Sequence, residues 1–151
     1  MTLTQKETSL LNDIKTQEQL CIEKYQKYAT AAHDPELQTL FGKLKQNEEK
    51  HLETVCQILS GTEVTLPAAP SAVQSKLQCT PSRCDETQKK EDAFLCRDAL
   101  SMEKHVASVY NTGVFEFCSP VLRDTLSHIQ KEEQNHGEML YNYLSCNQMY
   151  P

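Results

Sequence analysis

Hydrophobic side chains recur at steps of three and four residues in four segments of the chain, which is the spacing of one buried helix face. This pattern predicts helices over about 4–32, 35–59, 86–117 and 120–144. Only four Gly and six Pro interrupt the 151 residues, as expected of long helices. The pattern therefore predicts an all-α protein.

One acidic residue breaks the apolar row of the first segment. The inward row runs through Leu11, Ile14, Glu18, Cys21, Tyr25, Tyr28 and Ala32. Glu18 lies on this row, whereas Glu7 and Glu23 do not. The sequence thus predicts a carboxylate in the core of the first helix.

Helix-capping signals and a break in the periodicity predict two helix pairs joined by one long connection. Asp34-Pro35 and Ser119-Pro120 each place a capping residue before a Pro at the first helical position. The periodicity stops between them over about 61–86. A helix of about 25 residues is about 37 Å long, so a connection of this length can run along a whole bundle. This favours a bundle with one long crossover.

The second half of the chain repeats the first with a displacement of 85 residues. Glu18 with Glu48-x-x-His51 recurs as Glu103 with Glu133-x-x-His136 (103 − 18, 133 − 48 and 136 − 51 all equal 85). We therefore predict a single domain over 1–151. Its parts are a hairpin 4–60, a crossover 61–86, a hairpin 87–145 and a tail 146–151.

Composition excludes several classes of function. The net charge is −6 and the basic residues form no dense stripe, so we expect no nucleic-acid partner. No apolar run approaches the length of a membrane span, and no signal peptide is visible, so we expect cytoplasmic synthesis. The seven Cys are expected as thiols in a reducing cytosol. Cys79 and Cys84 are the best candidates for disulfides, either with each other or between molecules.

The repeated residues have the chemistry of a metal centre. Residues three apart share a helix face, so each Glu can join its His at one point. We assign Glu18 and His51 as terminal ligands of one ion and Glu103 and His136 as terminal ligands of a second. Glu48 and Glu133 would bridge the two ions. The four carboxylates would then balance two divalent cations, and oxygen and imidazole donors favour Fe or Mn, with Zn as a substitute.

Residues near these ligands leave alternatives open. Tyr25 and Tyr110 each lie seven positions after a candidate ligand. Their phenols could hydrogen-bond a ligand carboxylate across the bundle or take part in electron transfer, or they could be core aromatics with satisfied hydroxyls. Glu49 and Glu132 adjoin ligand residues but do not match under the repeat, so we expect both to face solvent.

The six-ligand pattern resembles that of the ferritin-like superfamily, which includes bacterioferritin, rubrerythrin and manganese catalase. The segment Asn47-Glu48-Glu49-Lys50-His51 is similar to the second-helix motif of rubrerythrin-type proteins. Leu100 stands where those proteins carry a further carboxylate. The resemblance implies a ferritin-like four-helix bundle with a di-metal centre.

The second half also resembles the spore coat protein F family of endospore-forming bacteria. The likeness rests on Leu95-Cys96-Arg97-Asp98-Ala99-Leu100, on the segment 119–126 and on the tail 143–151. The family's Gly before the terminal Tyr is absent, because Gln148 and Met149 occupy that region. This resemblance implies a place in the spore coat.

Two functions therefore remain open. The first is an oxidoreductase of peroxidase, catalase or ferroxidase type, whose di-iron or di-manganese centre handles O2, peroxide or Fe(II). The second is a structural coat protein whose metal site, if occupied, only stabilises the bundle. Copies of the same chain or other coat proteins would be its partners.

Overall fold

The computed structural model describes residues 2–65 and 80–150 and consists there of four α-helices without a strand. They are α1 (Gln5–Ala31), α2 (Pro35–Leu59), α3 (Glu86–Glu116) and α4 (Pro120–Cys146). The predicted all-α four-helix bundle is confirmed. The first three helices end within one residue of the predicted bounds, and α4 continues two residues beyond.

Capping side chains fix where the helices begin. The Thr4 side chain accepts the backbone N–H of Glu7, and the Glu7 carboxylate accepts the backbone N–H of Thr4, which makes a capping box. Asp34 and Ser119 cap α2 and α4, each with Pro at the first helical position, as the sequence predicts. These caps satisfy backbone donors that the first turn of a helix otherwise leaves unpaired.

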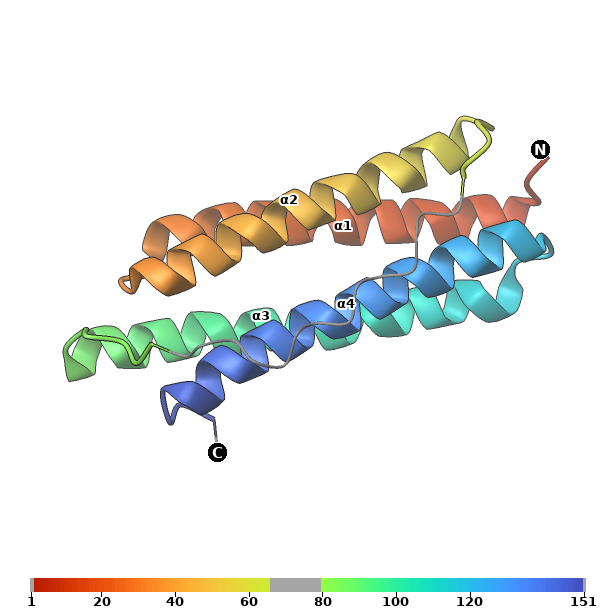
Figure 1. Cartoon of the computed structure of the whole chain (residues 1–151). Coiled ribbons are helices and arrows are strands. Elements are labelled where there is room, and N and C mark those ends of the chain that lie inside the picture. The colour runs from red at the N-terminus through yellow and green to blue at the C-terminus, as the bar shows by residue number, and fades with distance from the viewer. Residues whose placement is uncertain (1, 66–79, 151) are drawn as a thin grey trace.

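The helices form two antiparallel hairpins that pack side by side (Figure 1). α1 packs against α2 and α3, and α4 packs against α3 and α2. The end of α2 and the start of α3 lie at opposite ends of the bundle, which is the geometry that a long crossover serves. Residues 66–79 of the predicted crossover lie outside the described residues, so the domain subdivision stays a prediction.

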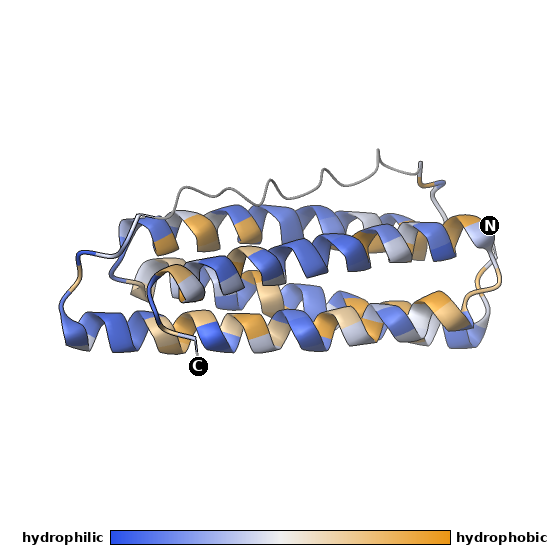
Figure 2. Cartoon of the chain, turned by 60° about the horizontal axis from the view of Figure 1, so that its bottom comes forward, coloured by the Kyte–Doolittle hydropathy of each residue, from blue (hydrophilic) through white to orange (hydrophobic). Residues whose placement is uncertain are grey.

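The core lies along the bundle axis, and each helix alternates hydrophilic and hydrophobic segments (Figure 2). Its large side chains with essentially no exposure include Tyr25, Tyr110, Phe41, Leu44, Leu126 and Leu140. Tyr28, which the sequence places on the inward row of α1, is only partly buried, as is Val114 of α3. Gly113 and Phe117 are buried near Val114 instead.

Two buried carboxylates tie each hairpin to the turn of the other. Glu7, predicted to lie off the inward face, is only 3% exposed and accepts the backbone N–H of Cys118 at 2.9 Å. Asp92 is fully buried and accepts the backbone N–H of His33 at 2.8 Å. The two ties are related by the repeat (92 − 7 and 118 − 33 both equal 85). They fix the register of the two hairpins.

The structure also bears on the predicted state of the Cys residues and on the predicted absence of a membrane span. Cys84 is a free thiol, so a disulfide between Cys79 and Cys84 is wrong, and Cys79 itself lies outside the described residues. Cys146 is disulfide-bonded, so the expectation that all seven Cys are thiols is wrong for this residue. Among the described residues, none of the four helices combines the length and apolar composition needed to span a bilayer.

Candidate metal centre

All six predicted ligands meet inside the bundle, and each of the four helices contributes. α1 and α3 supply Glu18 and Glu103, whereas α2 and α4 each supply a Glu and a His three residues apart. None of the six is more than 3% exposed: Glu18, Glu48, His51, Glu103, Glu133 and His136. A Glu that lies on the apolar face of a helix points into the core, because side chains three and four residues apart share that face.

The six side chains form two overlapping groups of four. One group consists of Glu18, Glu48, His51 and Glu133, and the other of Glu48, Glu103, Glu133 and His136. Within each group one ligand atom per residue lies within 4.8 Å of the others. Glu48 and Glu133 belong to both groups, which is the arrangement expected of bridging carboxylates. We call the two groups the Glu18/His51 half and the Glu103/His136 half.

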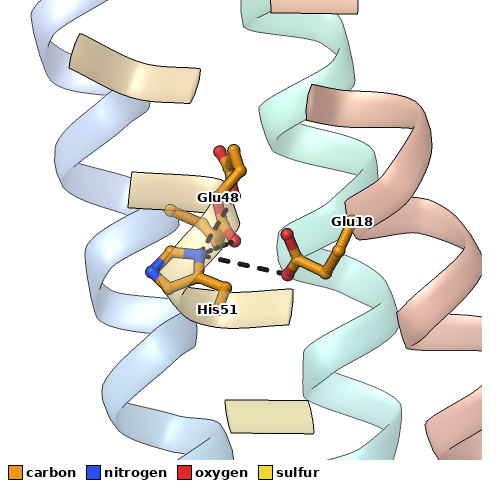
Figure 3. Close-up of side chains that lie close together, drawn as sticks. Glu18, Glu48 and His51 are labelled. Atoms are coloured by element: carbon orange, nitrogen blue, oxygen red, sulfur yellow. Dashed lines mark hydrogen bonds and ion pairs between the residues drawn. The ribbon is translucent and has the colours of Figure 1, made fainter. Parts of the chain in front are cut away.

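In the Glu18/His51 half, one ring nitrogen of His51 faces the carboxylates (Figure 3). Nδ1 lies 3.0 Å from Glu48 Oε2, 3.0 Å from Glu133 Oε1 and 3.9 Å from Glu18 Oε1. Nδ1 is therefore the atom of His51 that a metal ion would contact.

The Glu103/His136 half repeats this geometry. Nδ1 of His136 lies 3.0 Å from Glu48 Oε1, 3.3 Å from Glu133 Oε2 and 3.6 Å from Glu103 Oε2. The two imidazole rings are stacked at a centroid distance of 5.6 Å. The centre thus has the pseudo-twofold symmetry that the sequence repeat predicts.

The two buried tyrosines reach across the bundle to candidate ligands. The Tyr110 hydroxyl donates to Glu18 Oε1, and the Tyr25 hydroxyl donates to Glu103 Oε1. In each pair, the tyrosine and the glutamate belong to different hairpins. The structure thus shows the predicted hydrogen bond to a candidate ligand carboxylate, and the two tyrosines that donate it are also core aromatics.

Burial controls the protonation of the outer carboxylates. Desolvation, with the nearby charges of Glu48 and Glu133, raises the pKa of Glu18 well above its usual value. Desolvation likewise raises the pKa of Glu103, against the hydrogen bond of His136. For both residues, burial thus favours the neutral acid while no cation balances the charge.

For Glu48, Glu133 and the two imidazoles, hydrogen bonds outweigh burial and favour the charged form. Burial opposes charge on Glu48 and Glu133, but hydrogen bonds from His136 and His51 outweigh it and lower the pKa of both carboxyls. Burial also opposes charge on the imidazoles. Their hydrogen bonds to the surrounding glutamates nevertheless raise the pKa of His51 and His136 well above the usual value.

Three buried carboxylate oxygens fit a metal better than they fit the protein alone. Among the described residues, Glu18 Oε2, Glu103 Oε2 and Glu133 Oε2 have no hydrogen-bond partner. Unpaired buried oxygens are costly, and native proteins rarely leave them without a partner. Four carboxylates and two imidazole nitrogens, with no thiolate, are donors suited to Fe or Mn.

Sequence reasoning missed two residues that contact the outer nitrogens of the imidazoles. Glu132, predicted to face solvent, lies 2.9 Å from Nε2 of His51 and is only partly exposed. Asn47 lies 3.2 Å from Nε2 of His136. These residues are counterparts under the repeat (132 − 47 equals 85), and each directly precedes a candidate bridging Glu, which is the sequence signal that they share.

The other charged neighbours take no part in the centre. Glu49 is exposed as predicted and lies 3.5 Å from Lys45. Glu53 and Glu138 are exposed as well. Cys21 is buried beside the cluster, where desolvation and the surrounding glutamates raise the pKa of its thiol. That thiol stays protonated.

Comparison with known proteins places only the second half of the chain. Residues 91–151 match the model of a family described as Coat F domain. This stretch contains Glu103, Glu133 and His136 but not the three candidate ligands of the first hairpin. No curated protein and no solved structure matches the chain. The resemblance of the second half to spore coat protein F is thus supported, whereas the ferritin-like relationship stays a prediction.

Proposed function

We propose that this protein is a spore-coat-associated, ferritin-like protein whose carboxylate-bridged centre binds two Fe or Mn ions and handles O2, peroxide or Fe(II). The carrying observation is that Glu48 and Glu133 each belong to both groups of four buried ligands. A single-ion site would not need two overlapping sets. Glu18 with His51, and Glu103 with His136, would complete the two coordination spheres.

The donor set supports redox metals over a purely structural ion. Oxygen-rich sites with imidazole suit Fe and Mn, whereas structural Zn sites are typically built from Cys and His in a closed tetrahedron. Bound Fe or Mn supplies the electron transfer to O2 or peroxide that no side chain here can supply. The protein orients the carboxylates through Tyr25 and Tyr110 and keeps bulk water away.

A structural coat role is the second candidate, and two observations favour it. The family match covers residues 91–151, and the coat description is the only functional information that it carries. Near the end of the chain, Tyr141 and Tyr150 are exposed and their rings meet edge to face at 5.3 Å. Exposed phenols are available for oxidative cross-linking between coat proteins. Tyr143, by contrast, is buried and donates to Asp34.

Metal content and turnover, measured on the same sample, separate these functions. The full chain is loaded anaerobically with Fe(II) or with Mn(II), its bound metal is counted, and O2 or peroxide is then added while consumption is followed. We expect two ions per chain and catalytic consumption of oxidant. Two retained ions without turnover would leave the structural coat role. No retained metal would contradict both metal-dependent versions.

A further inference from the structure

The centre is symmetric in its candidate ligands but not in the groups behind its imidazoles. The six candidate ligands and the two tyrosines are identical between the repeats. The position before the bridging carboxylate differs: it is Asn47 in the first repeat and Glu132 in the second. Glu132 Oε2 lies 2.9 Å from Nε2 of His51, and Asn47 Nδ2 lies 3.2 Å from Nε2 of His136.

This difference acts on the hydrogen of the imidazole. A histidine that binds a cation through Nδ1 must carry its proton on Nε2, which then needs a hydrogen-bond acceptor. An ionised carboxylate only accepts, so Glu132 holds His51 with Nδ1 free to face the cation. Asn47 offers only a neutral amide, whose oxygen is the acceptor that must face Nε2 of His136 when Nδ1 of that ring serves as a ligand.

The two acceptors also differ in strength. A hydrogen bond to a carboxylate is charge-assisted and about twice as strong as one to a neutral amide. Carboxylate partners raise the basicity of an imidazole ligand, and their loss typically costs about 10–100-fold in metal affinity. Glu132 is held in place from outside, because Nε2 of His128 lies 3.6 Å from Glu132 Oε2.

We propose that the two halves of the centre bind divalent transition-metal cations in sequence, and that Glu132 makes the Glu18/His51 half the tighter and first-filled one. This inference rests on the proposed function, because it concerns the same di-metal site. It deepens that function by making Glu132 and Asn47 the positioning residues that set the order of loading. The ion held by Glu103 and His136 is then the more weakly bound and exchangeable one.

Calorimetric titration of the metal-free full chain with Zn(II), which cannot turn over, tests this order. Wild-type protein should show two steps, the first at least about tenfold tighter. Glu132→Gln, which places an amide there as at Asn47, should weaken the tight step by about tenfold or more and leave the weak step unchanged. Asn47→Asp should instead tighten the weak step. The fold of each variant is checked by circular dichroism.

Further variants identify the halves. Glu18→Ala should remove the tight step, whereas Glu103→Ala should remove the weak one. Glu49→Gln is the matched control, because it removes one negative charge next to the other candidate bridging residue, Glu48. The Glu49 side chain lies by Lys45 and away from the imidazoles, so both binding steps should persist.

Four outcomes would overturn the inference. An unchanged tight step in Glu132→Gln, or equal weakening of both steps, would show that Glu132 does not distinguish the halves. Two equal steps in wild-type protein would overturn this inference alone and leave the di-metal proposal standing. Absence of Zn(II) binding by wild-type protein would overturn both.

Discussion

At the scale of single residues, Glu48 is one of the two carboxylates that belong to both halves of the centre. Its two oxygens lie 3.0 Å from His51 Nδ1 and 3.0 Å from His136 Nδ1. Glu48→Ala removes a donor shared by both halves. We therefore expect the variant to lose at least one of two bound ions, as counted by elemental analysis after loading.

The fold should survive this change. The helices are held by apolar packing on both sides of the centre, so far-ultraviolet circular dichroism of Glu48→Ala should match that of the wild type. Glu49→Ala provides the control for a charge lost one residue away. An unchanged metal count in Glu48→Ala would remove Glu48 from the ligand set.

Tyr110→Phe tests the hydrogen bonds that cross the bundle. The Tyr110 hydroxyl donates to Glu18 Oε1, and its loss leaves that oxygen free to shift from the ion. We expect metal affinity of the Glu18/His51 half to fall by roughly tenfold, the size of effect seen when such outer partners are removed. Tyr25→Phe should act on the Glu103/His136 half instead. If both phenylalanine variants bind metal with wild-type affinity, Tyr25 and Tyr110 contribute to packing alone.

The sequence predicted which residues meet in the core but not what orients them. Glu18 stood out because helical periodicity placed a carboxylate on an apolar row, and the structure buries it as expected. Helical periodicity could not predict the role of Glu132, because this residue lies off the inward row of α4. Its carboxylate contacts Nε2 of His51, which belongs to another helix. Its contact depends on how α2 and α4 pack, which periodicity within one helix does not encode.

At the scale of helices, Gly42 is a weak point that packing does not require. It lies within α2, and an added Cβ would meet no atom within 4 Å. Gly42→Ala should raise the free energy of unfolding by about 0.5–1 kcal/mol, because alanine loses less backbone entropy in a helix. Urea unfolding of metal-free protein measures this change.

Gly113 is the matched control for that substitution. A Cβ there would lie 2.9 Å from Leu126 Cδ1, so Leu126 would have to move and the propensity gain would be offset. Gly113→Ala should therefore gain less than Gly42→Ala. A lower urea midpoint in Gly42→Ala would show that this glycine is needed for packing after all.

The buried carboxylates at the helix starts should matter more than surface charges. Glu7 accepts backbone hydrogen bonds from Thr4 at 2.8 Å and from Cys118 at 2.9 Å. Glu7→Gln turns one acceptor into a donor that faces an N–H group. We expect a loss of about 1–3 kcal/mol of unfolding free energy.

The pH dependence of this tie has a definite sign. The backbone hydrogen bonds of Thr4 and Cys118 lower the pKa of Glu7. Its contribution is therefore present above the ordinary carboxyl pKa of 4.5 and is lost as the pH falls through the lowered value. Urea midpoints of Glu7→Gln and the wild type should converge in acid, and a constant difference would contradict the assignment.

Helix bounds were predictable because the capping residues are local signals. Thr4, Asp34 and Ser119 lie directly before the first helical residues, and their side chains accept the first free N–H groups. The burial of Glu7 was not predictable in this way. Its partner Cys118 is 111 residues away, so only the packed pair of hairpins brings the two together.

At the scale of the whole molecule, the centre can stay electrically neutral with or without metal. In the metal-free protein the shifted pKa values favour neutral Glu18 and Glu103, ionised Glu48 and Glu133, and imidazolium at His51 and His136. Two divalent cations would then replace two carboxyl protons and two imidazolium protons. The bundle therefore avoids a buried net charge in both states.

Neutrality makes metal binding a proton exchange. Each ion displaces one proton from a carboxyl and one from an imidazolium, so affinity should fall as the pH falls. The groups with raised pKa, Glu18, Glu103, His51 and His136, stabilise the metal-free fold at low pH, and that contribution is lost as the pH rises through their folded-state pKa values. The gain in thermal midpoint on adding Zn(II) should therefore grow with pH.

Calorimetry in two buffers of different ionisation enthalpy measures the exchange. The binding enthalpy should shift in proportion to the buffer's ionisation enthalpy, with release approaching two protons per ion, as the two displaced groups require. Glu49→Gln should release as many protons as the wild type, because Glu49 lies outside the centre. Binding without proton release would mean that Glu18 and Glu103 are ionised, and His51 and His136 neutral, before metal arrives. Burial would then not control the charge of the core.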